Sequence, residues 1–160
     1  MAVVYSPATL ERHQAISDIE TASYPSDEAA SPEGVKFRIE NAGRYFMMAE
    51  RSGELLGYVN GTVTTADSLT HDSMGTHEPS GNMLCIHSVV VPEKFRREKV
   101  ATKMLKEYVE RVKAMDEVKC IALICKENLK GFYVSCGFTL VGPSAVVHGE
   151  DPWFEMRIQK

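Results

Sequence analysis

The sequence lacks the features of a membrane protein and of a disulfide-bonded secreted protein. No apolar run approaches the ~18 residues that a membrane-spanning helix needs. The first residues, MAVVYSPATLERH, contain neither the basic region nor the apolar stretch of a secretion signal. The chain has 4 cysteines and no C-x-x-C pair, which favours buried free thiols over disulfides. We therefore expect a cytoplasmic protein with no membrane segment.

The chain also lacks an excess of positive charge. Its 18 lysine and arginine residues are outnumbered by 22 aspartate and glutamate residues, and the formal net charge at pH 7 is −4. Proteins that bind nucleic acid usually present a basic surface, so nucleic acid is not an expected partner. Hydrophobic residues make up 44% of the 160 residues, which is enough for a core. This length predicts one domain, residues 1–160, since neither a linker nor an internal repeat divides it.

A strand, a basic turn and a helix follow one another between residues 82 and 112. NMLCIHSVVV is apolar and β-branched, so it predicts a buried strand, which Pro92 ends. ATKMLKEYVERV has the i, i+3, i+4, i+7 apolar spacing of an amphipathic helix. The turn between them carries four basic residues: Lys94, Arg96, Arg97 and Lys99. Because the amides and the positive dipole end of a helix face such a turn, the stretch predicts a site for a phosphorylated ligand.

The other periodic segments predict a mixed α/β domain. Before the central stretch we expect an edge strand at residues 2–5, a helix that Ser6 or Thr9 caps and that runs to about Ser23, a second helix at 32–42 and a hairpin at 44–64. The first helix would bury the stripe formed by Leu10, Ala15, Ile16 and Ile19. CIALIC is apolar without alternation, so residues 120–125 should pair in parallel with the central strand through a right-handed βαβ crossover. A short helix closed by Gly137 and a final antiparallel hairpin would complete the chain.

Two polar segments are expected to be loops. YPSDEAASPEG, which begins at Tyr24, is either a solvated loop or a flap over a pocket. Residues 66–81 contain His71 and His77, but no further ligand lies at a workable spacing from them. We therefore expect a solvated loop there, and no metal site.

These segments resemble the GCN5-related N-acetyltransferase (GNAT) superfamily over nearly the whole chain, and within it the arylalkylamine (serotonin-type) N-acetyltransferases. The matching pieces are LTHDSMGTHEPSG, LCIHSVVVPEKFRREKVATKMLKEYV and GFYVSCGFTLVGPSAVVHGEDPWFEM. The resemblance implies a GNAT-type α/β fold: a mixed, mostly antiparallel twisted sheet with a central parallel βαβ unit and flanking helices.

The resemblance also implies acetyl-CoA as co-substrate, without a metal. The family's phosphate loop, Q/R-x-x-G-x-G/A, falls on residues 96–101, and Lys99 stands where the family has its first glycine. The end of the central strand would pair with the pantetheine arm, and the amides of the loop and helix would hold the pyrophosphate. The residues implied in cofactor binding are Val89, Val90, Val91, Arg96, Arg97, Glu98, Lys99, Val100, Ala101, Thr102 and, more weakly, Asn128.

The catalytic residues implied by the resemblance are His87 and Tyr133. His87 would accept the proton of the amine, since an unperturbed imidazole titrates near ~6.5. Cys85 stands where vertebrate relatives have a second histidine on this strand. Tyr133, in the family's FY pair, would protonate the departing thiolate. Glu28 resembles a flap carboxylate proposed as the base in invertebrate-type relatives.

Four functions remain open from the sequence. The first is an acetyltransferase of arylalkylamines, with Tyr24 and Pro25 of the flap contacting the aromatic ring and Glu28 nearby. The second is a polyamine acetyltransferase, which the acidic residues of the flap would suit. A non-catalytic acyl-CoA sensor and a protein-acetylating module are the other two. In each case we expect a monomer or weak dimer.

Overall fold

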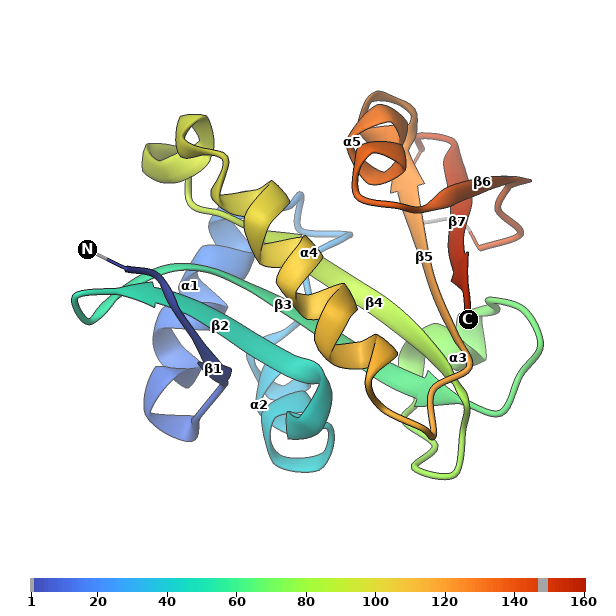
Figure 1. Ribbon diagram of the computed structural model, residues 1–160, viewed down its shortest axis with the longest axis horizontal. Helices are drawn as coiled ribbons and strands as arrows, with labels where there is room; N and C mark the ends of the chain where they lie inside the picture. The colour runs from blue at the N-terminus through green and yellow to red at the C-terminus, as the bar shows by residue number, and fades with distance from the viewer. Residues whose placement is uncertain (1, 147–149) are drawn as a thin grey trace. The chain divides into compact units, whose positions relative to one another are not determined.

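The structure is a computed structural model, and it describes residues 2–146 and 150–160 (Figure 1). A seven-stranded sheet has the order β1-β2-β3-β4-β5-β7-β6. The strands are β1 Val4–Pro7, β2 Phe46–Arg51, β3 Glu54–Thr64, β4 Met83–Val90, β5 Cys120–Lys126, β6 Thr139–Pro143 and β7 Trp153–Gln159. Strand β4 pairs with β5 in parallel, whereas the pairs β1–β2, β2–β3, β5–β7 and β6–β7 are antiparallel. This confirms the predicted mixed, mostly antiparallel sheet.

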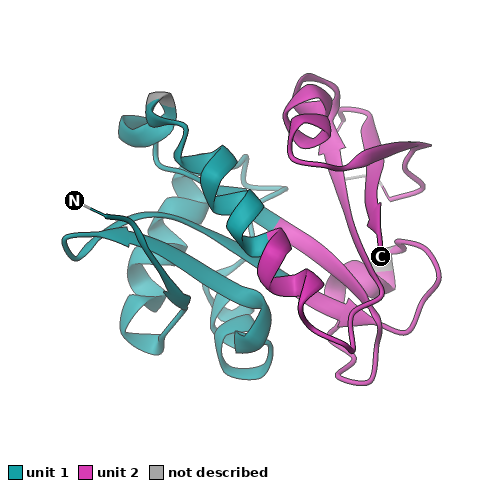
Figure 2. Ribbon diagram, in the orientation of Figure 1, with its two compact units in different colours: residues 1–61, 88–108 teal, residues 62–87, 109–160 magenta. Residues whose placement is uncertain are grey.

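Five α-helices and four 3-10 helices lie among the described residues. The α-helices are α1 His13–Ser23, α2 Pro32–Asn41, α3 His71–Gly75, α4 Val100–Lys113 and α5 Lys130–Ser135. The 3-10 helices are η1 Leu10–Arg12, η2 Gly43–Tyr45, η3 Glu93–Glu98 and η4 Glu127–Leu129. The chain divides into two compact units, unit 1 with residues 1–61 and 88–108, and unit 2 with residues 62–87 and 109–160 (Figure 2).

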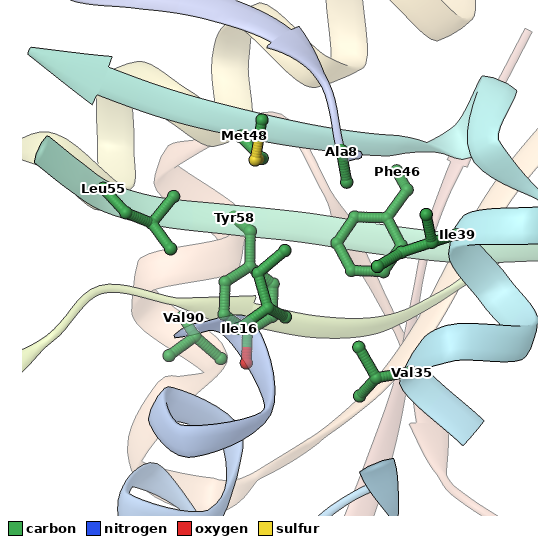
Figure 3. Close-up of a cluster of buried hydrophobic side chains, with 9 residues drawn as sticks. All are labelled: Ala8, Ile16, Val35, Ile39, Phe46, Met48, Leu55, Tyr58 and Val90. Carbon is green, nitrogen blue, oxygen red and sulfur yellow. The ribbon is translucent and has the colours of Figure 1, made fainter. Parts of the chain in front are cut away.

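In unit 1, helices α1 and α2 cover one face of the sheet and α4 covers the other (Figure 1). The core between α1, α2 and the strands is drawn in Figure 3 and consists of Ala8, Ile16, Val35, Ile39, Phe46, Met48, Leu55, Tyr58 and Val90. Ile16 is fully buried there, and Ala15 and Ile19 pack against the cluster. Leu10, predicted to belong to the same stripe, is 52% exposed, because α1 begins only at His13 and a 3-10 turn precedes it.

Gly57 in β3 marks a close approach of two backbones. The pairing of β2 with β3 shifts register at this point, from Ala49 opposite Gly57 to Glu50 opposite Leu55. A Cβ on Gly57 would lie 2.5 Å from the Val90 carbonyl oxygen. Gly57 thus lies beside a β-bulge and leaves room for the backbone of strand β4.

Unit 2 contains the parallel pair of strands, with Met83 opposite Cys120 and Cys85 opposite Ala122. Its core consists of Leu69, Met83, Cys85, Cys120, Ala122 and Val146. The four cysteines of the chain are all buried and free, as the sequence predicts. Gly137 follows α5 with a φ of 101°, a left-handed conformation that suits glycine.

The segment 66–81 is more ordered than a solvated loop. Thr70 caps helix α3 through a reciprocal capping box with Ser73, which satisfies two backbone donors at the helix start. Leu69 and Ser73 are buried, and His77 Nδ1 accepts the Val63 N–H at 3.3 Å. The loop expectation was therefore wrong in part, because this capping box and a buried leucine fold the segment onto the sheet.

Neither a membrane-crossing helix nor a metal cluster occurs in the described part of the chain. Within residues 2–146 and 150–160, no helix is both long and apolar enough to cross a membrane. The same residues include no group of three or more His, Cys, Asp or Glu side chains arranged to hold a metal ion.

Candidate active site

In unit 1 the basic turn after β4 is a 3-10 helix that leads into α4. Lys99 lies between the two helices with φ 61° and ψ 24°, in the left-handed region. Residues with a Cβ adopt this conformation only at a cost, whereas glycine does so freely. This accounts for the glycine that the resembling family has at this position. Lys99 is exposed, so its side chain does not crowd the turn from inside.

The turn is fixed at both ends by its own side chains. Arg96 Nε donates to the Val91 carbonyl at 3.0 Å, and Arg51 pairs with Glu98 at 3.2 Å. Phe95 is buried beneath the turn, with the Lys94 ammonium 5.0 Å from the centre of its ring. Two of the basic residues of the turn, Lys94 and Arg96, are therefore held by contacts within the fold.

The first turn of α4 has the geometry of an anion site. The Lys103 N–H donates to the Lys99 carbonyl at 3.2 Å. The backbone N–H groups of the three residues before it, Val100 to Thr102, have no acceptor within an α-helix. These N–H groups lie at the positive end of the dipole of a 14-residue helix, so they suit a phosphate ligand. The residues present at this turn thus fit the pyrophosphate of a coenzyme A ligand.

In unit 2, His87 lies on β4 and its imidazole is held by a buried threonine. Its Nε2 is 2.7 Å from the Thr62 hydroxyl of β3, and Thr62 is 3% exposed. His87 itself is half-buried. Cys85, two residues earlier on the same face, is fully buried, and burial raises the pKa of its thiol to about 12. A neutral thiol therefore stands where the vertebrate relatives have a histidine.

Tyr133 lies on α5, also in unit 2, and is 8% exposed. Its ring makes edge-to-face contacts with Phe132, at 5.0 Å between centroids, and with Phe138, at 5.7 Å. These contacts hold the ring in one orientation, as a group that donates a proton at a fixed point requires. Asn128, in η4, is exposed.

The flap residues of unit 1 lie in different surroundings. Tyr24 is half-buried against the core of unit 1, and burial raises its pKa, while the Val89 backbone and the Ser88 hydroxyl bond to its phenol oxygen. Pro25 is exposed, and its carbonyl accepts the N–H groups of Glu28 and Ala29, each at 2.9 Å. Glu28 is half-buried. The segment is thus a tight turn anchored by Tyr24 rather than an open loop.

Thr62 and Glu20 are two polar residues of these sites that sequence reasoning missed. Glu20 is only 2% exposed and accepts hydrogen bonds from Tyr58 and Ser88. A signal for Glu20 is present in the sequence, since it lies four residues after Ile16 and so falls on the apolar stripe of the first helix. The bond between Thr62 and His87 has no such signal, because it joins two separate strands.

The sequence was compared with known proteins and protein families. The family model described as "Acetyltransferase (GNAT) family" matches residues 13–138. A serotonin N-acetyltransferase of Mesocricetus auratus is 29% identical over 105 residues, which are 66% of this chain and 51% of that protein. The Homo sapiens serotonin N-acetyltransferase is 26% identical over 104 residues, 65% of this chain and 50% of its own length. The chain thus spans about half the length of the curated relatives it matches.

Solved structures share the fold at low sequence identity. A GNAT-like decarboxylase, GphF, in complex with isobutyryl-CoA has a TM-score of 0.84 at 14% identity, with 98% of each chain covered. Arabidopsis thaliana Naa50, in complex with the bisubstrate analogue CoA-Ac-MVNAL, has a TM-score of 0.77 at 12% identity, with 100% of each chain covered. At such identities the likeness concerns the fold alone. Since the family model covers most of the chain, the protein belongs to the GNAT acetyltransferase family.

Proposed function

We propose that the protein is an acetyl-CoA-dependent N-acetyltransferase of small primary amines, with arylalkylamines of the tryptamine, serotonin and phenethylamine type as its substrates. Membership of the GNAT family supports acetyl transfer. The observation that carries the proposal is the half-buried imidazole of His87, held at 2.7 Å by the buried hydroxyl of Thr62. An accessible base fixed in one orientation is what the attack of an amine requires.

His87 acts as the proton acceptor. An alkylamine is cationic at pH 7 and must lose a proton before it can attack a thioester. The Thr62 hydroxyl holds the ring through Nε2, and the imidazole takes the proton directly or through a water. With Cys85 kept neutral by its raised pKa, its thiol does not compete as a base at pH 7.

Acetyl-CoA supplies an activated acetyl group and a thiolate leaving group. Tyr133 donates its phenolic proton to that sulfur, and its two aromatic contacts keep the hydroxyl in place. In unit 1, the backbone of Val89 to Val91 pairs with the pantetheine arm. The N–H groups of residues 97–102, with Arg96 and Lys99 beside them, hold the pyrophosphate. Asn128 is a further polar contact to the cofactor.

The arylalkylamine substrate class is supported by the relatives named serotonin N-acetyltransferase. Tyr24 and Pro25 give the flap an aromatic ring and an exposed apolar surface, which suit an aromatic amine. Glu28, half-buried in the same turn, suits its ammonium group or serves as a second base. A polyamine would use the acidic residues of the flap instead, so the amine itself must be tested.

A panel of acyl acceptors tests the proposal. The protein is incubated with acetyl-CoA and tryptamine, phenethylamine, spermidine or a peptide with a free N-terminus, and thiol release is measured. We expect kcat/KM to be highest for tryptamine or phenethylamine. A preference for spermidine or for the peptide would overturn the substrate class, and binding of acetyl-CoA without turnover of any amine would indicate a sensor.

Two variants test the catalytic roles. His87→Ala should lower kcat/KM for tryptamine by ~10²-fold or more, as loss of a general base does. Tyr133→Phe should lower kcat while the affinity for acetyl-CoA, measured by calorimetry, stays within about twofold. An unchanged rate for His87→Ala removes it from the mechanism. If Tyr133→Phe loses acetyl-CoA affinity instead, Tyr133 is a cofactor contact.

A further inference from the structure

Glu20 is a carboxylate buried in the core of unit 1. It lies on α1, four residues after the fully buried Ile16, and is itself 2% exposed. Burying a carboxylate costs several kcal/mol unless hydrogen bonds replace its water. Neither of the proposed proton transfers, to His87 and from Tyr133, uses this group. A buried carboxylate of this kind therefore needs its own explanation.

The carboxylate of Glu20 accepts hydrogen bonds from three different elements. The Tyr58 hydroxyl of β3, whose ring is drawn in Figure 3, donates to Oε1 at 2.7 Å. The Ser88 hydroxyl of β4 donates to the same oxygen at 3.1 Å and lies 3.4 Å from Oε2. The Ala30 N–H donates to Oε2 at 3.0 Å. Each carboxylate oxygen thus has at least one donor.

Arg38 on α2 interacts electrostatically with Glu20. Burial lowers the pKa of the Arg38 guanidinium, and the charge of Glu20 opposes that shift. The guanidinium Nη1 donates to the Asn60 side-chain oxygen at 3.2 Å. The helix that follows the flap thus carries a charge that favours an ionised Glu20.

The carboxylate of Glu20 links the end of the flap to strand β4. It accepts the Ala30 N–H, where the segment 24–30 ends, and the hydroxyl of Ser88 on β4. At the start of the flap the Tyr24 N–H donates to the Glu20 carbonyl at 3.2 Å, which is the last ordinary backbone bond of α1 and requires no particular side chain. The contact that depends on Glu20 is therefore the one that its carboxylate makes between Ala30 and the strands.

We propose that Glu20 is a positioning residue that fixes the 24–30 flap on β4 and so sets the wall against which the amine binds. The proposal rests on the proposed function, because it assigns the flap to the amine. Its basis is the geometry of this clasp, since a residue that served packing alone would not need a buried carboxylate that joins the Ala30 N–H to the hydroxyls of two strands. The role is distinct from catalysis, because Glu20 is too buried to touch a substrate.

The variant Glu20→Gln tests the clasp with little change in shape. The amide keeps one acceptor oxygen, and its NH₂ group would face one of the present donors, so at least one of the bonds from Tyr58, Ser88 or Ala30 is lost. We expect the KM for tryptamine to rise about tenfold, which corresponds to ~1.4 kcal/mol of binding. The KM for acetyl-CoA should stay within about twofold. Hydrogen exchange should quicken in the flap peptide but not in β3 or β4.

The control variant is Asp18→Asn, which removes the same charge from the exposed face of α1. It should leave both KM values and the flap exchange unchanged. If Glu20→Gln does not fold, Tyr58→Phe removes one donor to the carboxylate and should give a weaker effect of the same kind. Unchanged tryptamine KM and unchanged flap exchange in the folded variant would overturn the proposal, as would faster exchange throughout the chain.

The exchange measurement separates this proposal from the proposed function. If the wild-type protein acetylates no amine, the proposed function fails. Hydrogen exchange that is faster in the Glu20→Gln variant than in wild type, and only in the flap, would still support the clasp. If the wild-type protein acetylates tryptamine and the variant shows unchanged KM and unchanged flap exchange, the clasp fails and the function stands.

Discussion

Thr62 orients the proposed base. Its hydroxyl lies 2.7 Å from His87 Nε2. Thr62→Val keeps the shape and removes this hydrogen bond, whose net worth is about 0.5–1.5 kcal/mol. We expect kcat/KM for tryptamine to fall ~3- to 10-fold. Thr62→Ser, which keeps the hydroxyl, should retain nearly full activity. Equal losses in the two variants would contradict an orienting role.

Lys99 is strained by its left-handed backbone, with φ 61°. Lys99→Gly removes that strain, so the free energy of unfolding in urea should rise by about 0.5–1 kcal/mol. Lys103→Gly is the matched control, because Lys103 is exposed within α4. There glycine should lower the stability by about 0.7–1 kcal/mol. A loss of stability in both variants would show that the left-handed backbone at Lys99 carries no strain.

At the residue scale, sequence reasoning finds a site residue when one strand or one turn determines its place. The alternation along β4 predicts that Cys85 and His87 share a face, and the glycine of the family motif draws attention to Lys99. The partner of His87 is 25 positions away in the chain, and that of the Glu20 carboxylate on β4 is 68 positions away. Such contacts are made by packing, so no local pattern reveals them.

At the scale of elements, periodicity predicts the strands and longer helices well, because the spacing of apolar residues in each segment determines which face is buried. The hairpin of β2 and β3, the parallel pair of β4 and β5 and helix α4 all lie where the apolar spacing places them. Short elements are predicted poorly. Helix α3 depends on the capping box of Thr70 and Ser73, and η3 has too few residues for a period to be visible.

The carboxylate of Glu78 helps to hold the segment between α3 and β4 against the end of β3. Glu78 accepts the hydroxyls of Thr64 and Thr65, each at 2.8 Å, and the Thr65 N–H at 3.2 Å. These bonds hold the Glu78 pKa below its ordinary value of 4.5. The stabilisation is therefore present above the unfolded pKa and is lost as the pH falls through the lower folded pKa.

Glu78→Gln should destabilise the protein at pH 7. The gap, which is the difference in the free energy of unfolding between wild type and variant, should narrow as the pH falls from 6 to 3.5. The measurement is the free energy of unfolding in urea at each pH. Glu110→Gln, at an exposed position of α4, should show no such change of gap. A gap for Glu78→Gln that is constant over this range would contradict the role of its charge.

For the whole molecule, the buried thiols set how stability changes at high pH. Burial raises the pKa of Cys85 from the reference value of 9.0 to about 12, so its unfolded form ionises at a lower pH than its folded form. The contribution of this thiol to stability is complete below pH ~9 and is lost as the pH rises toward the folded pKa.

We expect the free energy of unfolding to fall from pH 8 to 10.5. In Cys85→Ala this fall should be smaller, by up to about 1.4 kcal/mol for each pH unit above 9. Val63→Ala, at a fully buried site that does not titrate, should lower the stability without changing the slope. Parallel curves for wild type and Cys85→Ala would mean that this thiol ionises alike in the folded and unfolded protein.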